Sequence, residues 1–223
     1  MLYYLTPKDV VQVCLTHRSA ENIICKNNDF WFEKIMRDFG DVYEIKRENI
    51  PVENRLETYK SYWKDAPLLL LLCAERGDTE SVRSLLRIGV DLNFQNKHGT
   101  APLMAASREG LVDMVRLLLE HGAKPNIQNV YGYTALLFAS GMRYPDIVRM
   151  LLEHNADPDL QNKKGSTALM DASWGGYTNI VRMLLKHGAH PDIHDKNGWT
   201  ALREASREGH DDIVRLLEPL LVI

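Results

Sequence analysis

The feature that most constrains the fold is a strict 33-residue spacing of small and apolar residues. Glycines keep this step at one place, and alanines, valines and leucines keep it at others: Gly99, Gly132, Gly165 and Gly198; Ala106, Ala139, Ala172 and Ala205; Val82, Val115, Val148, Val181 and Val214; Leu85, Leu118, Leu151, Leu184 and Leu217. Repeats of this length are typical of chains in which each repeat buries its apolar face against its neighbours. The sequence therefore predicts a stack of about five repeats from residue 66 onward.

The chemistry of one repeat, residues 165–197, explains the spacing. Gly165 permits a positive φ at a tight turn, and Thr167 can cap the helix that follows. Apolar residues in the i, i+1, i+4, i+5 pattern over 180–185 predict a second helix, which Gly188 ends. Each repeat is therefore expected to be a helix pair plus a turn.

These residues resemble the ankyrin repeat family. The likeness is carried by the segments Gly99–Ala106, Gly132–Leu136, Gly165–Leu169 and Gly198–Leu202, and by the second-helix segment Ile147–His154. The resemblance implies an all-α fold, an ankyrin-repeat solenoid of helix pairs with short β-hairpin-like turns. It places an ankyrin domain at 66–223, with repeats at about 66–98, 99–131, 132–164, 165–197 and 198–223.

The sequence departs from the family pattern at a few positions. Ala101 replaces the usual threonine of the second repeat, and Arg143 and Asn155 replace turn glycines of the third. Asn155 tolerates a left-handed conformation, whereas Arg143 followed by Tyr144-Pro145 predicts a reshaped turn between the helices. The first repeat begins with the apolar run Leu68–Leu72, which we expect to need a cover.

The first 65 residues are expected to form a small helical domain, because they hold ten of the eighteen aromatic residues. Helices are predicted after Thr6 and over 19–25 and 29–39. The stretches Leu5–Arg18 and Asn28–Trp31 resemble the later part of an F-box. The positions that carry this likeness are Leu5, Pro7, Val10, Val11, Cys14, Leu15 and Trp31.

The F-box resemblance implies an adaptor function. The ankyrin array would bind a target protein, and the N-terminal segment would dock to the adaptor subunit of an SCF-type ubiquitin ligase. The family's opening Leu-Pro-x-Glu helix, which supplies part of that contact, would lie before Met1. A second hypothesis therefore stays open, in which the chain is a plain binding or inhibitory module and residues 1–65 are only a structural cap. Proteins that combine these two modules are frequent in large DNA viruses and intracellular bacteria, which suggests a host–pathogen role. The expected location is the cytoplasm or nucleus, or the host-cell cytoplasm for an effector.

Ankyrin proteins usually bind partners with the turn tips and the concave surface of the inner helices. Mapped onto this sequence, that pattern predicts a protein-binding surface made of Lys97, His98, Thr100, Arg108, Glu109, Val130, Tyr131, Tyr133, Phe138, Met142, Lys163, Lys164, Ser166, Asp171, Trp174, Lys196, Asn197, Trp199, Glu204 and Arg207. Rigid aromatics beside arginine are the usual composition of binding hot spots. Tyr131, Tyr133, Trp174 and Trp199 are expected to form one aromatic ridge, and its basic rim favours an acidic or mixed partner.

Composition limits other functions. A net charge of −3 provides no general affinity for nucleic acid or anionic lipid. The longest apolar run, residues 67–74, is far shorter than the roughly 20 residues that span a bilayer. The three cysteines, Cys14, Cys25 and Cys73, have no metal spacing and indicate reduced thiols in a reducing compartment.

No catalytic constellation, cofactor motif or metal site is predicted. The serines at 107, 140, 173 and 206 keep the repeat spacing, so they are interpreted as structural. His187, His190 and His194 straddle a helix end and a turn, which does not match metal-ligand spacing. Asn93 and Asn126 resemble the positions that an asparaginyl hydroxylase modifies in ankyrin proteins. The alternative for these asparagines is hydrogen bonding within the exit turn.

Overall fold

A computed structural model describes residues 55–220 of the protein. The chain divides into two compact units, residues 1–73 with 78–92 and residues 74–77 with 93–223. All regular structure in the described range is helical, and this range contains no strand. The F-box-like positions and the helices predicted before residue 40 lie outside the described residues.

The first unit contains two described helices, α4 (Arg55–Arg76), of which only the last turn lies outside this unit, and α5 (Thr79–Arg87). Helix α4 starts before the predicted beginning of the repeats at residue 66 and continues across Pro67. Leu70 and Leu71 are buried, whereas Leu68 and Leu72 are exposed. The apolar run thus splits into a covered and an uncovered part.

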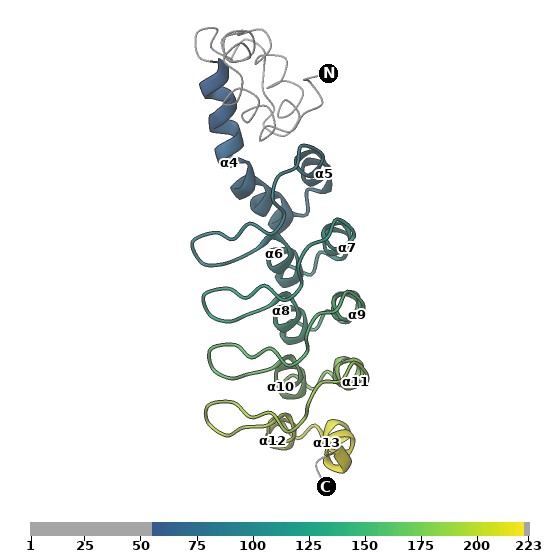
Figure 1. Cartoon of the computed structure of the whole chain (residues 1–223). Helices are drawn as coiled ribbons and strands as arrows, with labels where there is room; N and C mark the ends of the chain where they lie inside the picture. The colour runs from purple at the N-terminus through teal and green to yellow at the C-terminus, as the bar shows by residue number, and fades with distance from the viewer. Residues whose placement is uncertain (1–54, 221–223) are drawn as a thin grey trace. The chain divides into compact units, whose positions relative to one another are not determined.

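The second unit contains four helix pairs at the predicted spacing. They are α6 (Pro102–Arg108) with α7 (Val112–Glu120), α8 (Ala135–Gly141) with α9 (Pro145–Glu153), α10 (Ala168–Trp174) with α11 (Thr178–Lys186), and α12 (Ala201–Glu208) with α13 (Asp211–Leu217). A short 3₁₀ turn, η4 (Glu218–Leu220), follows α13. Figure 1 shows α6, α8, α10 and α12 in one column, which we call the inner helices, and α7, α9, α11 and α13 in another. The loops between pairs project on the side of the inner helices, and we call their ends the tips.

Local sequence explains where the inner helices begin. The side chains of Thr134, Thr167 and Thr200 each accept a hydrogen bond from the backbone N–H three residues later, at 3.2 to 3.3 Å. This satisfies one of the backbone donors that every helix start leaves open. Ala101 makes no such bond, and Pro102 at the first helical position begins α6 instead.

The repeat core consists of the periodic apolar residues. Ala106, Ala139, Ala172 and Ala205 are fully buried, and so are the leucines at the second-helix position: Leu85, Leu118, Leu151, Leu184 and Leu217. The alanines lie where inner helices of successive repeats pack against one another. A small side chain at these fully buried positions lets the inner helices approach closely, which explains the alanine spacing.

Hydrogen bonds join each tip to the next. The backbone N–H groups of Val130, Lys163 and Lys196 donate to carbonyl oxygens of the preceding tip, those of His98, Tyr131 and Lys164, at 2.9 to 3.0 Å. Within each tip, hairpin-like backbone bonds occur, such as Asn129 N to Tyr133 O at 3.0 Å. The Asn129 side chain organises the tip, because its Oδ1 accepts from the N–H groups of Tyr131 and Tyr133. The hairpin-like turns of the predicted fold therefore exist as hydrogen-bonded loops without strands.

The prediction of a reshaped turn at Arg143 is wrong. Arg143 has a φ of +64°, close to the +73° of Gly110 and the +71° of Gly176 at the equivalent positions. The bond that closes this turn, Tyr144 N to Ala139 O at 3.0 Å, has counterparts at Leu111 and Tyr177. The repeat holds Arg143 in the left-handed region that glycine occupies elsewhere. Asn155 also adopts this conformation, as its residue type predicts, with a φ of +62°.

Two glycine substitutions separate backbone strain from the cost of crowding between repeats. Gly122 and Gly132 both have positive φ, but a Cβ atom at Gly122 meets nothing within 4 Å, whereas one at Gly132 lies 2.8 Å from the Lys163 backbone nitrogen. We expect Gly122→Ala to lower the free energy of unfolding by about 1 kcal/mol. Gly132→Ala should lower it by about 2 kcal/mol more, because the neighbouring tip must move. Urea unfolding of both variants measures this difference, and equal losses would contradict the stacking argument.

Candidate protein-binding surface

Exposed apolar side chains gather on the third repeat. Tyr131 at the tip is 60% exposed, Met142 at the end of α8 is 53% exposed, and Val130 is 41% exposed. Between them, Tyr133 stacks on Phe138 with ring centroids 5.0 Å apart. The third repeat therefore presents an apolar strip from its tip to the end of its inner helix.

Trp174 continues this surface on the fourth repeat. It is the last residue of α10 and 55% of it is exposed. The equivalent position on α8 is Gly141, which carries no side chain, and on α6 and α12 it is an arginine. Met142 and Trp174 thus lie at the C-terminal ends of two successive inner helices, α8 and α10. Gly141, which precedes Met142 and is the repeat equivalent of Trp174, carries no side chain.

Trp199 at the fifth tip is half-buried, because two side chains of α12 cover it. The guanidinium carbons of Arg203 and Arg207 lie 4.8 and 4.7 Å from the ring centroid. Cation–π contacts at this distance stabilise the stacked arrangement. Of the four aromatics predicted to form one ridge, Tyr131 and Trp174 are exposed, whereas Tyr133 and Trp199 are partly covered by the chain itself.

The predicted arginines are paired within the chain. Arg108 contacts Glu75 Oε1 at 2.7 Å and Glu109 Oε1 at 2.8 Å. These contacts, led by the hydrogen bond that Arg108 Nε donates to Glu109, raise the pKa of the guanidinium. Arg207 contacts Glu204 at 3.0 Å and Glu208 at 2.7 Å. The other predicted charged and polar tip residues are exposed: Lys97, His98, Lys163, Lys164, Lys196 and Asn197. Thr100 is partly buried within its tip.

Asp171 is the most perturbed titratable group among the described residues. Its Oδ1 accepts a hydrogen bond from Ser166 Oγ at 2.6 Å. Burial raises the pKa of its carboxyl to about 6, the nearby charge of Glu204 adds to this, and the Ser166 bond and Lys164 oppose it. Burial also raises the pKa of the Tyr133 phenol, and the negative charge of Asp171 raises it further. Asp171 and Tyr133 therefore belong to one electrostatic neighbourhood that spans two repeats.

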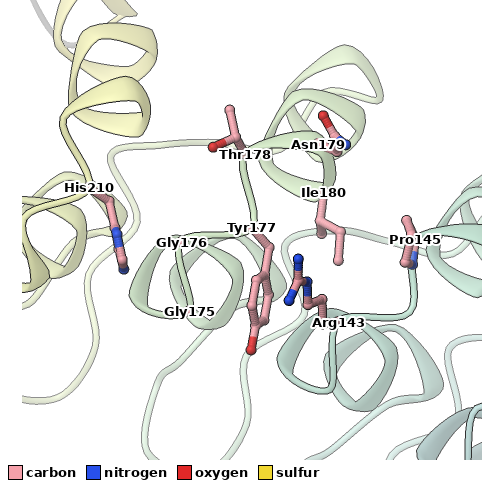
Figure 2. Close-up of a pocket in the computed structure, with 9 residues that line it drawn as sticks. All are labelled: Arg143, Pro145, Gly175, Gly176, Tyr177, Thr178, Asn179, Ile180 and His210. Atoms are coloured by element: carbon pink, nitrogen blue, oxygen red, sulfur yellow. The ribbon is translucent and has the colours of Figure 1, made fainter.

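A groove opens where the helix–helix turns of the third, fourth and fifth repeats meet. Its volume is about 520 Å³, and Figure 2 shows Arg143 beside the Tyr177 ring, with His210 entering from the fifth repeat. The Arg143 guanidinium carbon lies 5.8 Å from the centre of that ring. A Cβ atom at Gly175 would lie 2.5 Å from the Tyr177 ring, and one at Gly176 would lie 2.6 Å from the His210 ring. The absence of side chains at Gly175 and Gly176 therefore lets the two rings pack directly on the backbone. The residues that line the groove include no carboxylate and no thiol.

Three of the four repeat-spaced serines are buried, whereas Ser206, His187 and His194 are exposed. Ser107, Ser140 and Ser173 are fully buried in the inner helices, and their hydroxyls have no hydrogen-bond partner. The ring of His190 contacts the Asp159 carboxylate, and this hydrogen bond raises the pKa of the imidazole. Within residues 55–220, no group of three or more histidine, cysteine or acidic side chains could hold a metal ion. The same range contains no helix long and apolar enough to cross a bilayer.

The two asparagines that resemble hydroxylation sites link successive exit turns. Asn93 Oδ1 accepts from Lys124 N at 2.8 Å, and Asn126 Oδ1 accepts from Asp157 N at the same distance. The amide of Asn126 also donates to Asn155 O at 3.2 Å. These bonds join neighbouring repeats rather than closing one turn, and modification of these residues stays a prediction.

Comparison with known proteins agrees with the repeat geometry. A family model of ankyrin repeats, in three copies, matches residues 70–162 and 154–219. No curated protein matches the chain. The family model covers more than half of the sequence and follows the helix pairs of the structure. The chain therefore belongs to the ankyrin repeat family.

Proposed function

We propose that the chain binds a target protein through the tips and inner helices of its third, fourth and fifth repeats. Ankyrin repeats are protein-interaction modules and are generally not enzymes. The observation that carries the proposal is the exposure of Tyr131, Met142 and Trp174, each more than half exposed. Large apolar side chains gathered on one surface mark sites of protein association.

The shape and composition of this surface favour a protein over a small molecule. Small-ligand sites are typically enclosed cavities. The apolar strip instead lies on loops and helix ends, which a protein surface can cover. The remaining predicted positions, from Lys97 and His98 through Arg108 to Glu204 and Arg207, would form the polar rim of the interface. Rim charges of this kind influence orientation and association rate more than affinity.

Removal of two exposed aromatics tests the proposal. We expect Tyr131→Ala/Trp174→Ala to weaken target binding at least roughly tenfold, because hot-spot aromatics each contribute about 1 to 2 kcal/mol or more. Affinity purification with mass spectrometry identifies the target captured by the wild type, and calorimetry with the purified target then measures the loss. Arg149→Ala/Arg182→Ala changes two exposed residues on α9 and α11, in the other column of helices, and is the matched control. Unchanged affinity in the aromatic variant would refute this surface.

A second function rests on the F-box-like sequence. In this proposal the N-terminal segment docks to the adaptor subunit of an SCF-type ubiquitin ligase, and the ankyrin array presents the target. Its support is the sequence pattern alone, and the rival hypothesis gives residues 1–65 only the role of a cap.

Direct binding to the purified ligase adaptor subunit separates these two hypotheses. The docking hypothesis predicts co-elution of the full chain with the adaptor, and loss of this complex in Val10→Asp/Leu15→Asp, since a buried carboxylate disrupts an apolar contact. Target binding should survive in the same variant. If neither the chain nor a version with a restored upstream helix binds the adaptor, the docking hypothesis is wrong.

A further inference from the structure

One acidic side chain on the inner helices has no cationic partner. Asp171 on α10 and Glu204 on α12 hold the same position in successive repeats, where α8 carries Phe138. Glu204 Oε2 lies 3.0 Å from Arg207 Nη2. Within residues 55–220, no lysine, arginine or histidine lies within ion-pair distance of Asp171, whose one side-chain hydrogen bond comes from Ser166.

The repeats show how such a carboxylate is neutralised elsewhere in the array. One position near the end of each inner helix holds Arg108, Gly141, Trp174 and Arg207 in turn. Where this position is an arginine, it pairs with an acidic side chain: Arg108 with Glu75, and Arg207 with Glu204. Three residues after Asp171, where α12 carries Arg207, α10 carries Trp174, so Asp171 lacks the arginine that pairs with Glu204. Gly141 of the preceding repeat leaves open space next to Asp171.

The space at Gly141 reaches the carboxylate. A Cβ atom placed at Gly141 would lie 3.9 Å from both Cβ and Oδ2 of Asp171. Apart from its chain neighbours and the backbone of its own helix, no other described residue has an atom within 4 Å of this position. The oxygen that faces this space is the one that Ser166 does not bind. A cationic group entering beside Gly141 would therefore find a free carboxylate oxygen. Phe138 belongs to the same helix as Gly141, and Met142 is its C-cap residue, so apolar side chains lie on the element that borders this space.

We propose that this place takes a lysine or arginine side chain of the target protein, so that the recognised segment has a basic residue next to apolar ones. The inference rests on the proposed function, since it names the chemistry of the partner for the same surface. The basic rim had favoured an acidic or mixed partner. Arg108 and Arg207 of that rim are paired internally, whereas the Asp171 carboxylate has no cationic partner in the described part of the chain, which makes a cationic group the complementary one at this place.

The protonation of Asp171 predicts how binding of a cationic group should depend on pH. The groups that influence its pKa are Lys164 and Ser166 from its own tip and Glu204 from α12. The charge of Asp171 in turn raises the pKa of Tyr133 on the preceding tip. With a carboxyl pKa of about 6, Asp171 is charged above that pH and neutral below it. Attraction for a cation should therefore be present at about pH 7.5 and weaken as the pH falls through about 6.

The same shift predicts the effect on stability. The folded-state pKa lies above the unfolded value, so the native protein binds more protons than the unfolded chain between about pH 4 and 6. Stability should fall as the pH rises through that window, and Asp171→Asn should abolish this fall. The variant is therefore expected to fold, with a urea midpoint at neutral pH at or above that of the wild type.

A peptide selection tests the proposal. Phage-displayed random peptides of about 12 residues are selected on the full chain, and the most enriched peptide is then synthesised. We expect enriched peptides to carry lysine or arginine within two positions of an aromatic or aliphatic residue. In fluorescence anisotropy at about pH 7.5, Asp171→Asn/Glu204→Gln should bind this peptide roughly tenfold more weakly, as should wild type with a peptide whose basic residue is alanine. Glu120→Gln/Glu153→Gln, on α7 and α9, makes the same charge change elsewhere and should bind as wild type does.

The outcomes distinguish this inference from the proposed function. Loss of binding in Asp171→Asn/Glu204→Gln, together with a pH dependence near 6 that this variant lacks, supports it. If that variant binds as wild type does while Tyr131→Ala/Trp174→Ala loses the peptide, the cation site is wrong and the proposed surface stands. If neither variant changes binding, both are wrong. Enrichment of acidic peptides, or of none, also overturns the cation site. Circular dichroism of every variant confirms that folding is intact.

Discussion

The close approach of successive tips is the constraint on which the rest of the array depends. At Gly132 and Gly165 a Cβ atom would lie 2.8 to 2.9 Å from the backbone of the next tip. This proximity allows Lys163 and Lys196 to donate their backbone N–H groups to the preceding tip. The buried alanines allow the same approach between the inner helices. Because no helix pair can bury its apolar face alone, these contacts between repeats supply most of the tertiary stabilisation.

Stacking also determines how a binding surface can be built. Residues 33 positions apart become neighbours, so each column of the surface is one repeat position occupied by different side chains. The column Arg108, Gly141, Trp174, Arg207 contains two internally paired arginines, a gap and an exposed aromatic ring. The scaffold tolerates this variation because these side chains point away from the buried alanine and leucine positions.

Much of the architecture follows from local sequence. The helix pairs, the threonine caps and the left-handed conformation of Asn155 are all confirmed, since each depends on residues within one repeat. The turn at Arg143 was predicted wrongly, because residue preference at that position is weaker than the packing of the helices on either side. A left-handed arginine costs about 1 to 2 kcal/mol, and the buried leucines of the same repeat outweigh that cost.

The 33-residue spacing predicted the helix pairs of the second unit and the buried alanine and leucine positions, because burial in a stack recurs with each repeat. It also predicted surface positions, but not whether the side chain at each position is exposed or paired with another side chain. Whether Trp199 is exposed depends on Arg203 and Arg207 stacking on it. Among the described residues Asp171 is unpaired because Trp174 stands where α12 carries Arg207, and Gly141 of the preceding repeat leaves space beside it. Such contacts join side chains across repeats and between tip and helix. Their charge and exposure were therefore decided only when the repeats were stacked in three dimensions.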